Sequence, residues 1–170
     1  QIAEQAGVKL VTIHGRTRCQ MYKGHADWLA VKAVVNSVQI PVLVNGDITN
    51  CETAKTALKA SRAAGVMVGR AAIGQPWLLA QIADYLPGLP VRLVPDMLQR
   101  NLMMIKHLTD ITNEKGEMGL RSARKHFASY CDHLEESDEL RAVAMRTSSA
   151  SELKGAILEY FLKSSRLTAA

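Results

Sequence analysis

The feature that most constrains the fold is a unit of sequence that occurs three times in the first half of the chain. Each unit has a short run rich in branched apolar residues, then a glycine with polar neighbours, then a stretch with helical spacing. Such runs are typical of parallel strands buried on both faces. Strand, loop and helix repeated at this length predict right-handed crossovers, which build either an open doubly wound sheet or a (β/α) barrel. The runs are residues 9–13, 42–44 and 66–68.

The helical stretches between the runs carry start signals. Asp27 is placed to cap a helix whose apolar residues recur between 28 and 38 at spacings of three and four. Thr49 and Glu52 fit a capping box that opens a second helix. Pro76 suits the first turn of a third. The first half is therefore predicted to be an α/β domain.

From about residue 91 the pattern changes to helices without strands, and the segment 87–90, with two prolines and a glycine, marks the junction. Ser149 and Glu152 offer a capping box for the last helix. We therefore predict two domains, residues 1–90 and residues 91–170, the second an all-α helical bundle of four helices. Its apolar stripes lie in 98–108, 120–134, 140–143 and 153–161.

Charge and cysteine content narrow the function classes. The chain of 170 residues has a net charge of +5, which permits a polyanionic partner. Residues 1–90 hold nine Lys and Arg against five Asp and Glu, whereas residues 91–170 hold twelve against eleven, so a nucleic-acid surface in the second half must come from local clustering. Three widely spaced cysteines predict no disulfide framework, no bound metal and a reducing, cytoplasmic location.

The ends and the apolar runs of the sequence bear on targeting. The first residue is glutamine, and no basic and apolar leader precedes the first run, so we expect a truncated chain. Every apolar run is far shorter than the ~20 residues of a membrane-spanning helix, so no membrane partner is predicted.

All three polar clusters follow the predicted strands, where ligands bind in barrels and open α/β sheets alike. Gly69 would let the backbone approach a phosphate, and Arg70 could add a charge-assisted bond. An ordinary turn with a solvated arginine is the alternative, and Asn45-Gly46-Asp47 has the same ambiguity between a turn and a ligand site. His14 could donate to a cofactor or substrate carbonyl, although a lone histidine is more often structural.

Two basic segments are candidates for RNA contacts. The loop 16–23 mixes Arg16, Arg18 and Lys23 with Tyr22, which suits a phosphate backbone with a stacked base, and a solvated loop is the alternative. Arg121, Arg124 and Lys125, with His126, form a basic helix face that is either simply solvated or binds RNA phosphates. Cys19 lies among the cations of the loop, but a nucleophilic role is the minor interpretation.

The order and spacing of four segments closely resemble the tRNA-dihydrouridine synthases, in particular the bacterial DusB branch. The resemblance covers most of the chain, because three strand-end motifs lie in register with one helical motif. The segments are residues 12–18 (TIHGRTR), 41–48 (PVLVNGDI), 67–77 (MVGRAAIGQPW) and 121–126 (RSARKH).

This resemblance implies the C-terminal part of a TIM (β/α)8 barrel, about three β/α units that would be its sixth to eighth, followed by a helical domain that binds tRNA. It implies an FMN-dependent, NADPH-driven reduction of the C5=C6 bond of a uridine in tRNA to dihydrouridine. Hydride passes from the flavin to C6 and a cysteine protonates C5, after the uridine has left its stack. The implied FMN-binding residues are His14, Asn45, Gly46, Asp47, Gly69 and Arg70.

The chain departs from the family pattern in what it lacks. A full barrel needs ~250 residues, and the family's N-terminal flavin loop, catalytic cysteine and flavin-contacting lysine have no counterpart here. We therefore predict no catalytic residue in this chain, and that the chain alone is inactive. The alternatives are a non-catalytic RNA-binding remnant and another FMN-dependent TIM-barrel oxidoreductase. The expected state is a monomer.

Overall fold

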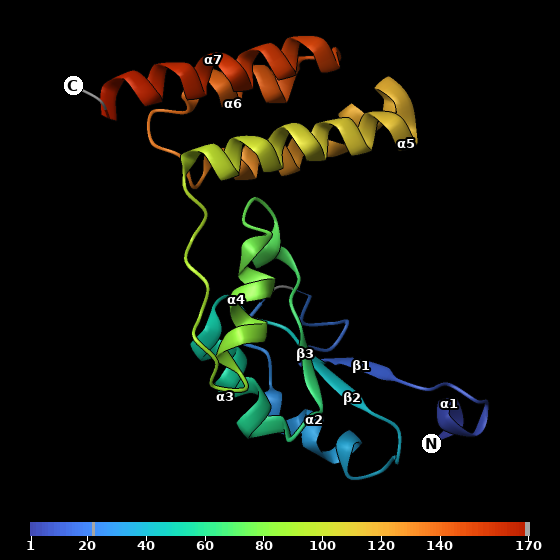
Figure 1. Cartoon of the computed structure of the whole chain (residues 1–170). Coiled ribbons are helices and arrows are strands. Elements are labelled where there is room, and N and C mark those ends of the chain that lie inside the picture. The colour runs from blue at the N-terminus through green and yellow to red at the C-terminus, as the bar shows by residue number, and fades with distance from the viewer. Residues whose placement is uncertain (22, 169–170) are drawn as a thin grey trace. The chain divides into compact units, whose positions relative to one another are not determined.

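The computed structural model describes residues 1–21 and 23–168, with their side chains up to residue 164, so the predicted base-stacking role of Tyr22 lies outside the described residues (Figure 1). The chain divides into two compact units. The first comprises residues 1–72 and 76–92, and the second comprises residues 73–75 and 93–170. The first holds α1 (Ile2–Gln5), β1 (Val11–His14), α2 (Trp28–Val35), β2 (Val42–Asn45), α3 (Cys51–Ser61), β3 (Gly65–Met67), η1 (Arg70–Ala72) and α4 (Trp77–Tyr85), and the second holds α5 (Met97–Cys131), α6 (Asp138–Arg146) and α7 (Ala150–Thr168).

The three strands form one parallel sheet in the order β1-β2-β3. His14 is the register partner of Asn45, and Asn45 is the partner of Met67, so the carboxyl ends of all three strands meet at one edge. Each strand overlaps the run that predicts it, and no strand end differs from the end of its run by more than two residues. The shared edge places the three polar clusters beside one another.

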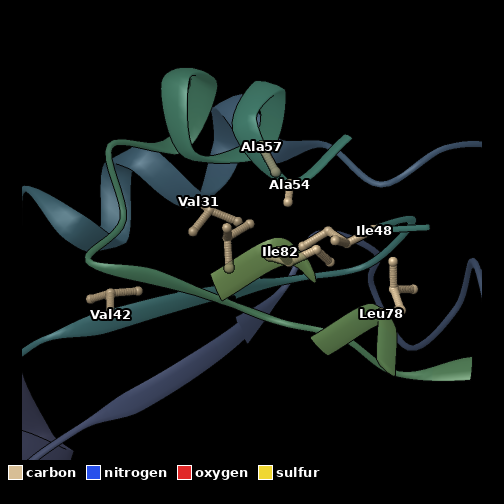
Figure 2. Packing of buried hydrophobic residues seen from close by; sticks show 8 residues of the cluster. Val31, Val42, Ile48, Ala54, Ala57, Leu78 and Ile82 are labelled. Carbon is tan, nitrogen blue, oxygen red and sulfur yellow. The ribbon is translucent and has the colours of Figure 1, made fainter. Parts of the chain in front are cut away.

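One face of the sheet carries the core of the first unit. Val42 and Val44 of β2 are buried in a single cluster with residues of α2, α3 and α4 (Figure 2). Along β1 burial alternates, and Thr12 and His14 are exposed. The expectation of strands buried on both faces is therefore wrong for this chain, because all the helices that join the cluster pack on the same face. The buried residues of the cluster are Val31, Val42, Val44, Ile48, Ala54, Ala57, Leu78 and Ile82.

Local capping fixes where the helices of the first unit begin. Asp27 caps α2 as predicted, and its carboxylate accepts from the Ala30 N–H. The predicted box of Thr49 and Glu52 is wrong by one residue: Asn50 and Thr53 form the reciprocal capping box of α3. Asparagine suits this position because its side-chain oxygen satisfies an unpaired N–H of the first turn.

The second unit is built from α5, α6 and α7, which pack on one another. Gly116 breaks α5 with φ 60° and ψ −160°, a conformation open essentially to glycine alone. The two arms of α5, before and after this break, run antiparallel, because the Arg100 guanidinium donates to the His133 carbonyl and His107 lies against His126. The stripes predicted in 98–108 and 120–134 are thus the two arms of a helical hairpin. The core of the second unit includes Met104, Leu120 and Phe127 of α5 together with Leu153 and Ile157 of α7.

The end of the first unit is held by a two-pronged ion pair. Arg92 donates from Nε and Nη2 to the buried Asp84 of α4, at 2.6 and 2.8 Å. The hydrogen bonds from the Arg92 side chain and backbone hold the pKa of Asp84 below its usual range, against the smaller opposing effect of burial. The pair keeps the segment after α4 on the first unit as far as Arg92.

No helix within the described part of the chain is long and apolar enough to span a membrane. Among the same residues, no group of three His, Cys, Asp or Glu side chains is placed to hold a metal ion.

Candidate functional site

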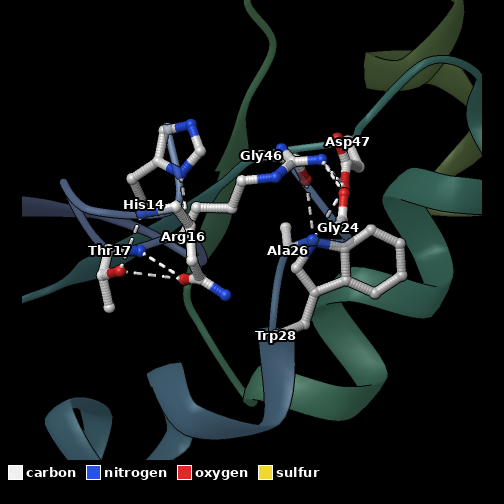
Figure 3. A network of polar contacts seen from close by, with 9 residues as sticks. His14, Arg16, Thr17, Gly24, Ala26, Trp28, Gly46 and Asp47 are labelled. Carbon is white, nitrogen blue, oxygen red and sulfur yellow. Dashed lines mark hydrogen bonds and ion pairs between the residues drawn. The ribbon is translucent and has the colours of Figure 1, made fainter. Parts of the chain in front are cut away.

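The loops that follow β1 and β2 are joined to each other at the carboxyl edge of the sheet (Figure 3). The Gly15 N–H donates to the Asn45 carbonyl at 2.8 Å, which extends the strand pairing by one residue. The Asp27 N–H then returns to the Gly15 carbonyl at 2.8 Å. Residues 16–26 therefore leave the sheet and come back to the same point as a closed loop.

His14 is the last residue of β1 and is exposed at this edge. Its Nδ1 accepts the backbone N–H of Arg16 at 3.0 Å. Because Nδ1 is an acceptor in this bond, the hydrogen of the neutral ring lies on Nε2. The arrangement makes His14 a hydrogen-bond donor at Nε2, which is the role that a cofactor or substrate carbonyl requires.

Arg16 and Asp47 form an ion pair between the two loops, with 2.7 Å between Nη2 and Oδ2. The Arg16 side chain is only 6% exposed, and the same Nη2 also donates to the Gly24 carbonyl at 2.7 Å. Burial opposes the charged form of Asp47, but the Ala26 N–H and the Arg16 guanidinium outweigh it and hold the pKa of this carboxyl below its usual range. The Arg16 guanidinium thus faces inward, toward Gly24 and Asp47.

Gly46 lies where the two loops come closest. Its φ is +112°, and a Cβ there would come within 2.9 Å of the Ala26 Cβ and 3.1 Å of the His14 Cε1. The indole Nε1 of Trp28 donates to the Gly46 carbonyl at 2.8 Å. A glycine is needed at this position because neither the backbone conformation nor the space allows a side chain.

The end of β3 completes the edge. The Asn45 side chain donates from Nδ2 to the Met67 carbonyl at 2.6 Å, so it links the second strand end to the third. Gly69 differs from Gly46, because a Cβ on Gly69 would meet nothing within 4 Å. Arg70 follows and begins η1. The open space over Gly69 is of the kind that lets a backbone approach a phosphate.

The predicted basic face lies on the second arm of α5. Arg121 and Lys125 are exposed there, one helical turn apart. Arg124 is half-buried, and its guanidinium donates to the carbonyls of Arg146 and Thr147. In the first unit, the loop after β1 carries two exposed cations of its own, Arg18 and Lys23.

The second unit holds a cavity of about 790 Å³ whose lining includes neither Arg121 nor Lys125. Acidic side chains line it, and they would repel RNA phosphates. The acidic residues are Glu135, Glu136, Asp138, Glu139 and Glu159.

Comparison with known proteins matches residues 1–166 to the dihydrouridine synthase (Dus) family. The chain belongs to this family. It is 43% identical over 162 residues to a protein of Rickettsia bellii named probable tRNA-dihydrouridine synthase, which covers 95% of this chain and 50% of the relative. A protein of Rhodobacter capsulatus with the same name is 48% identical over 145 residues, 85% of this chain and 44% of the relative. tRNA-dihydrouridine synthase B of Shewanella oneidensis is 37% identical over 163 residues, 95% and 50% of the two chains.

This member of the Dus family spans about half the length of the curated relatives it matches. The resemblance read from the four motifs is confirmed at the level of the family. The individual assignments of His14, Asn45, Gly46, Asp47, Gly69 and Arg70 to a flavin, and of the basic residues to RNA, stay predictions.

The cysteines of this Dus chain lie in unlike surroundings. Burial raises the pKa of the Cys131 thiol to about 11 and also raises that of Cys51. Neither thiol is activated for nucleophilic chemistry, which requires the thiolate. Cys19 is exposed on the loop after β1.

Sequence reasoning missed Trp28, Ala26 and Gly24 as parts of the site. Trp28 is assigned by its spacing to the apolar stripe of α2, yet its indole N–H holds the Gly46 carbonyl. A partly buried tryptophan needs a hydrogen-bond acceptor, and this was the available signal. Ala26 and Gly24 act through backbone atoms, which leave no trace in the identity of the residue.

Proposed function

We propose that the protein carrying this chain reduces the C5=C6 bond of a uridine in tRNA to dihydrouridine, with FMN as cofactor and NADPH as reductant. The observation that carries the proposal is the meeting of His14, Asn45 and Gly69 at adjoining strand ends in a chain of the Dus family. Relatives that align with almost the whole chain are named tRNA-dihydrouridine synthases, which supports uridine in tRNA as the substrate.

We propose further that β1, β2 and β3 are the last strands of a (β/α)8 barrel. The strands are neighbours in sequence order, and α2, α3 and α4 all join one cluster on one face of the sheet. A doubly wound sheet places helices on both faces, whereas a barrel places them all outside. The exposed face, with Thr12 and His14, would then line the interior of the barrel.

The residues at the strand ends fit FMN. Gly69 leaves open the space that a phosphate would fill, and Arg70 would add a charge-assisted bond to it. His14 would donate from Nε2 to a carbonyl oxygen of the flavin or uracil ring. When bound and reduced by NADPH, FMN would supply a hydride to C6 of the uridine, and C5 would receive a proton. We propose that the proton donor lies outside this chain, because the family's catalytic cysteine has no counterpart among Cys19, Cys51 and Cys131.

The basic residues would hold the RNA. Arg121 and Lys125 on α5, and Arg18 and Lys23 on the loop after β1, are exposed cations that would neutralise backbone phosphates. The target base must leave its stack before reduction, so the phosphate contacts would position the strand around it. The protein would work where tRNA is made and modified, in the cytoplasm.

The assay is dihydrouridine formation in unmodified tRNA with NADPH, measured by mass spectrometry on the intact protein after FMN loading. We expect the product to appear with protein, tRNA and NADPH together and to be absent without any one of them. We also expect the 170-residue chain alone to be inactive, because the family's catalytic cysteine and N-terminal flavin loop have no counterpart in it. Salt-dependent tRNA binding without flavin uptake by the intact protein would instead indicate an RNA-binding protein without this activity.

Gly69→Ala tests the phosphate position. The methyl group would meet no protein atom within 4 Å, so the fold should tolerate it, whereas it would occupy the space proposed for the phosphate. FMN affinity should fall by about tenfold or more with an unchanged melting temperature. Gly155→Ala in α7, where a Cβ also meets nothing within 4 Å, is the matched control and should leave FMN affinity unchanged.

A further inference from the structure

We propose that Arg16 and Asp47 are a positioning pair: they hold the loop 16–26 closed over Gly46, so that the loop presents Arg18 and Lys23 in a fixed place. The role differs from the two separate roles that sequence reasoning gives these residues, an RNA contact for Arg16 and a flavin contact for Asp47. The effect of this pair on catalysis rests on the proposed function, whereas the closure of the loop by the pair does not depend on that function.

The Arg16 side chain is nearly buried, and its guanidinium bonds to protein atoms. Its side chain is 6% exposed, so it cannot reach a polyanion in solvent. A single nitrogen, Nη2, donates at 2.7 Å to both the Gly24 carbonyl and Asp47 Oδ2. One guanidinium thus joins the start of its own loop, the far side of that loop and the end of β2.

Asp47 binds the loop at both of its ends. Its Oδ2 accepts from Arg16 and from the Ala26 N–H, both at 2.7 Å, so the oxygen is shared by the two sides of the loop. The backbone of Asp47 has φ 53°, a left-handed conformation that aspartate adopts more often than most residues other than glycine. In this conformation its carboxylate makes the two loop bonds.

The loop between these anchors carries the exposed cations. Arg18 and Lys23 lie between Arg16 and Gly24, and both are exposed. Thr17 and Gln20 bond to each other within the loop, through the Thr17 N–H and hydroxyl to the Gln20 side-chain oxygen at 2.8 and 3.0 Å. A loop held at both ends presents its charges without paying the ordering entropy at the moment of binding.

Trypsin cleavage after Arg18 and Lys23 reads out loop closure in the intact protein. The rate is expressed relative to cleavage after Arg62, an exposed residue at the end of α3, so that any general loss of folding cancels. Arg16→Met and Asp47→Asn should each raise the relative rate about tenfold, and the double variant should be no faster than either, because one interaction is lost in all three. Asp84→Asn removes the ion pair with Arg92 and is the matched control, with no change expected.

Arg16→Lys keeps the charge but offers no planar fork, so an intermediate rate is expected from a variant that disturbs folding least. Unchanged relative cleavage in Asp47→Asn and Arg16→Lys would overturn the proposal. So would effects that multiply in the double variant, since they would mean that the two residues act separately.

Binding measurements separate positioning from direct contact. For a positioning pair, Arg16→Met and Asp47→Asn should raise the KM for tRNA by similar factors and leave kcat much less affected. For direct contacts, Asp47→Asn should lower FMN affinity alone and Arg16→Met should lower tRNA affinity alone, which would overturn the pairing of roles. If the wild-type protein makes no dihydrouridine, the proposed function fails, and the cleavage experiment still decides whether the loop is held by this pair.

Discussion

The strand-end edge and the basic face of α5 hold their polar residues in opposite ways. At the strand ends, Arg16, Asn45 and Asp47 bond to protein atoms 21 to 31 residues away in the sequence, so each is fixed by the fold. On α5, Arg121 and Lys125 stand exposed on a helix. The first arrangement suits a ligand whose atoms must be placed one by one, and the second suits a polyanion that needs only charge in the right region.

The largest expected effect tests whether the two regions are energetically separate. Phe127 is fully buried in the second unit, and Phe127→Ala should cost about 3–5 kcal/mol of stability there. If the units unfold separately, hydrogen exchange should rise throughout α5, α6 and α7 while the amides of β1, β2 and β3 keep their protection. Equal loss of protection in both would mean a single cooperative unit and would remove the basis of the comparison.

The next effect tests the fixed character of the strand-end edge. Gly46→Ala would bring a Cβ within 2.9 Å of the Ala26 Cβ at φ +112°, and we expect a loss of about 2–4 kcal/mol in stability. Gly24→Ala is the control, because Gly24 also has a positive φ, +69°, but a Cβ there meets nothing within 4 Å. It should cost only about 1–2 kcal/mol, as measured by urea denaturation. Equal costs would show that the close approach of the loops is unimportant.

The sequence predicts the local features of this chain better than the contacts between its loops. The strands and the α2 cap are local patterns, in which a branched apolar run or an aspartate before a helical stretch already fixes the structure. The capping box of α3 was misplaced because Thr49–Glu52 fits the pattern one residue before Asn50–Thr53 does. The pairing of Arg16 with Asp47 lies 31 residues apart and depends on how two loops meet, so no local pattern contains it.

A smaller effect tests the charge-only character of the basic face. Arg121→Ala with Lys125→Ala should weaken tRNA binding and reduce the slope of log affinity against log salt by about 2, because about one counterion is released per phosphate contact. Lys163→Ala, which removes a lysine paired with Glu139 and Glu159, is the control and should leave the slope unchanged. An unchanged slope in the double variant would show that this face does not meet RNA.

The smallest effect comes from two histidines between the arms of α5. Burial, and then the neighbouring His126, lower the pKa of His107, partly offset by Asp110; burial and Lys125 lower that of His126. The folded protein favours the neutral rings. Their contribution to the free energy of unfolding is therefore complete above the usual histidine pKa of about 6.5, and it is lost as the pH falls below that value. The urea midpoint of the second unit should therefore fall between about pH 7.5 and pH 5.5. His107→Gln with His126→Gln should flatten this dependence, and the single variant His133→Gln should not.

We expect FMN to bind at the strand ends and tRNA to bind at the loop after β1 and on α5. Hydrogen exchange of the intact protein alone, with FMN, and with tRNA tests this assignment in one experiment. The account predicts that FMN protects the amides that follow β2 and β3, around Gly46 and Gly69, and that tRNA protects the loop 16–26 and the second arm of α5. Protection of α5 by FMN, or an unchanged strand-end edge when FMN is bound, would contradict it.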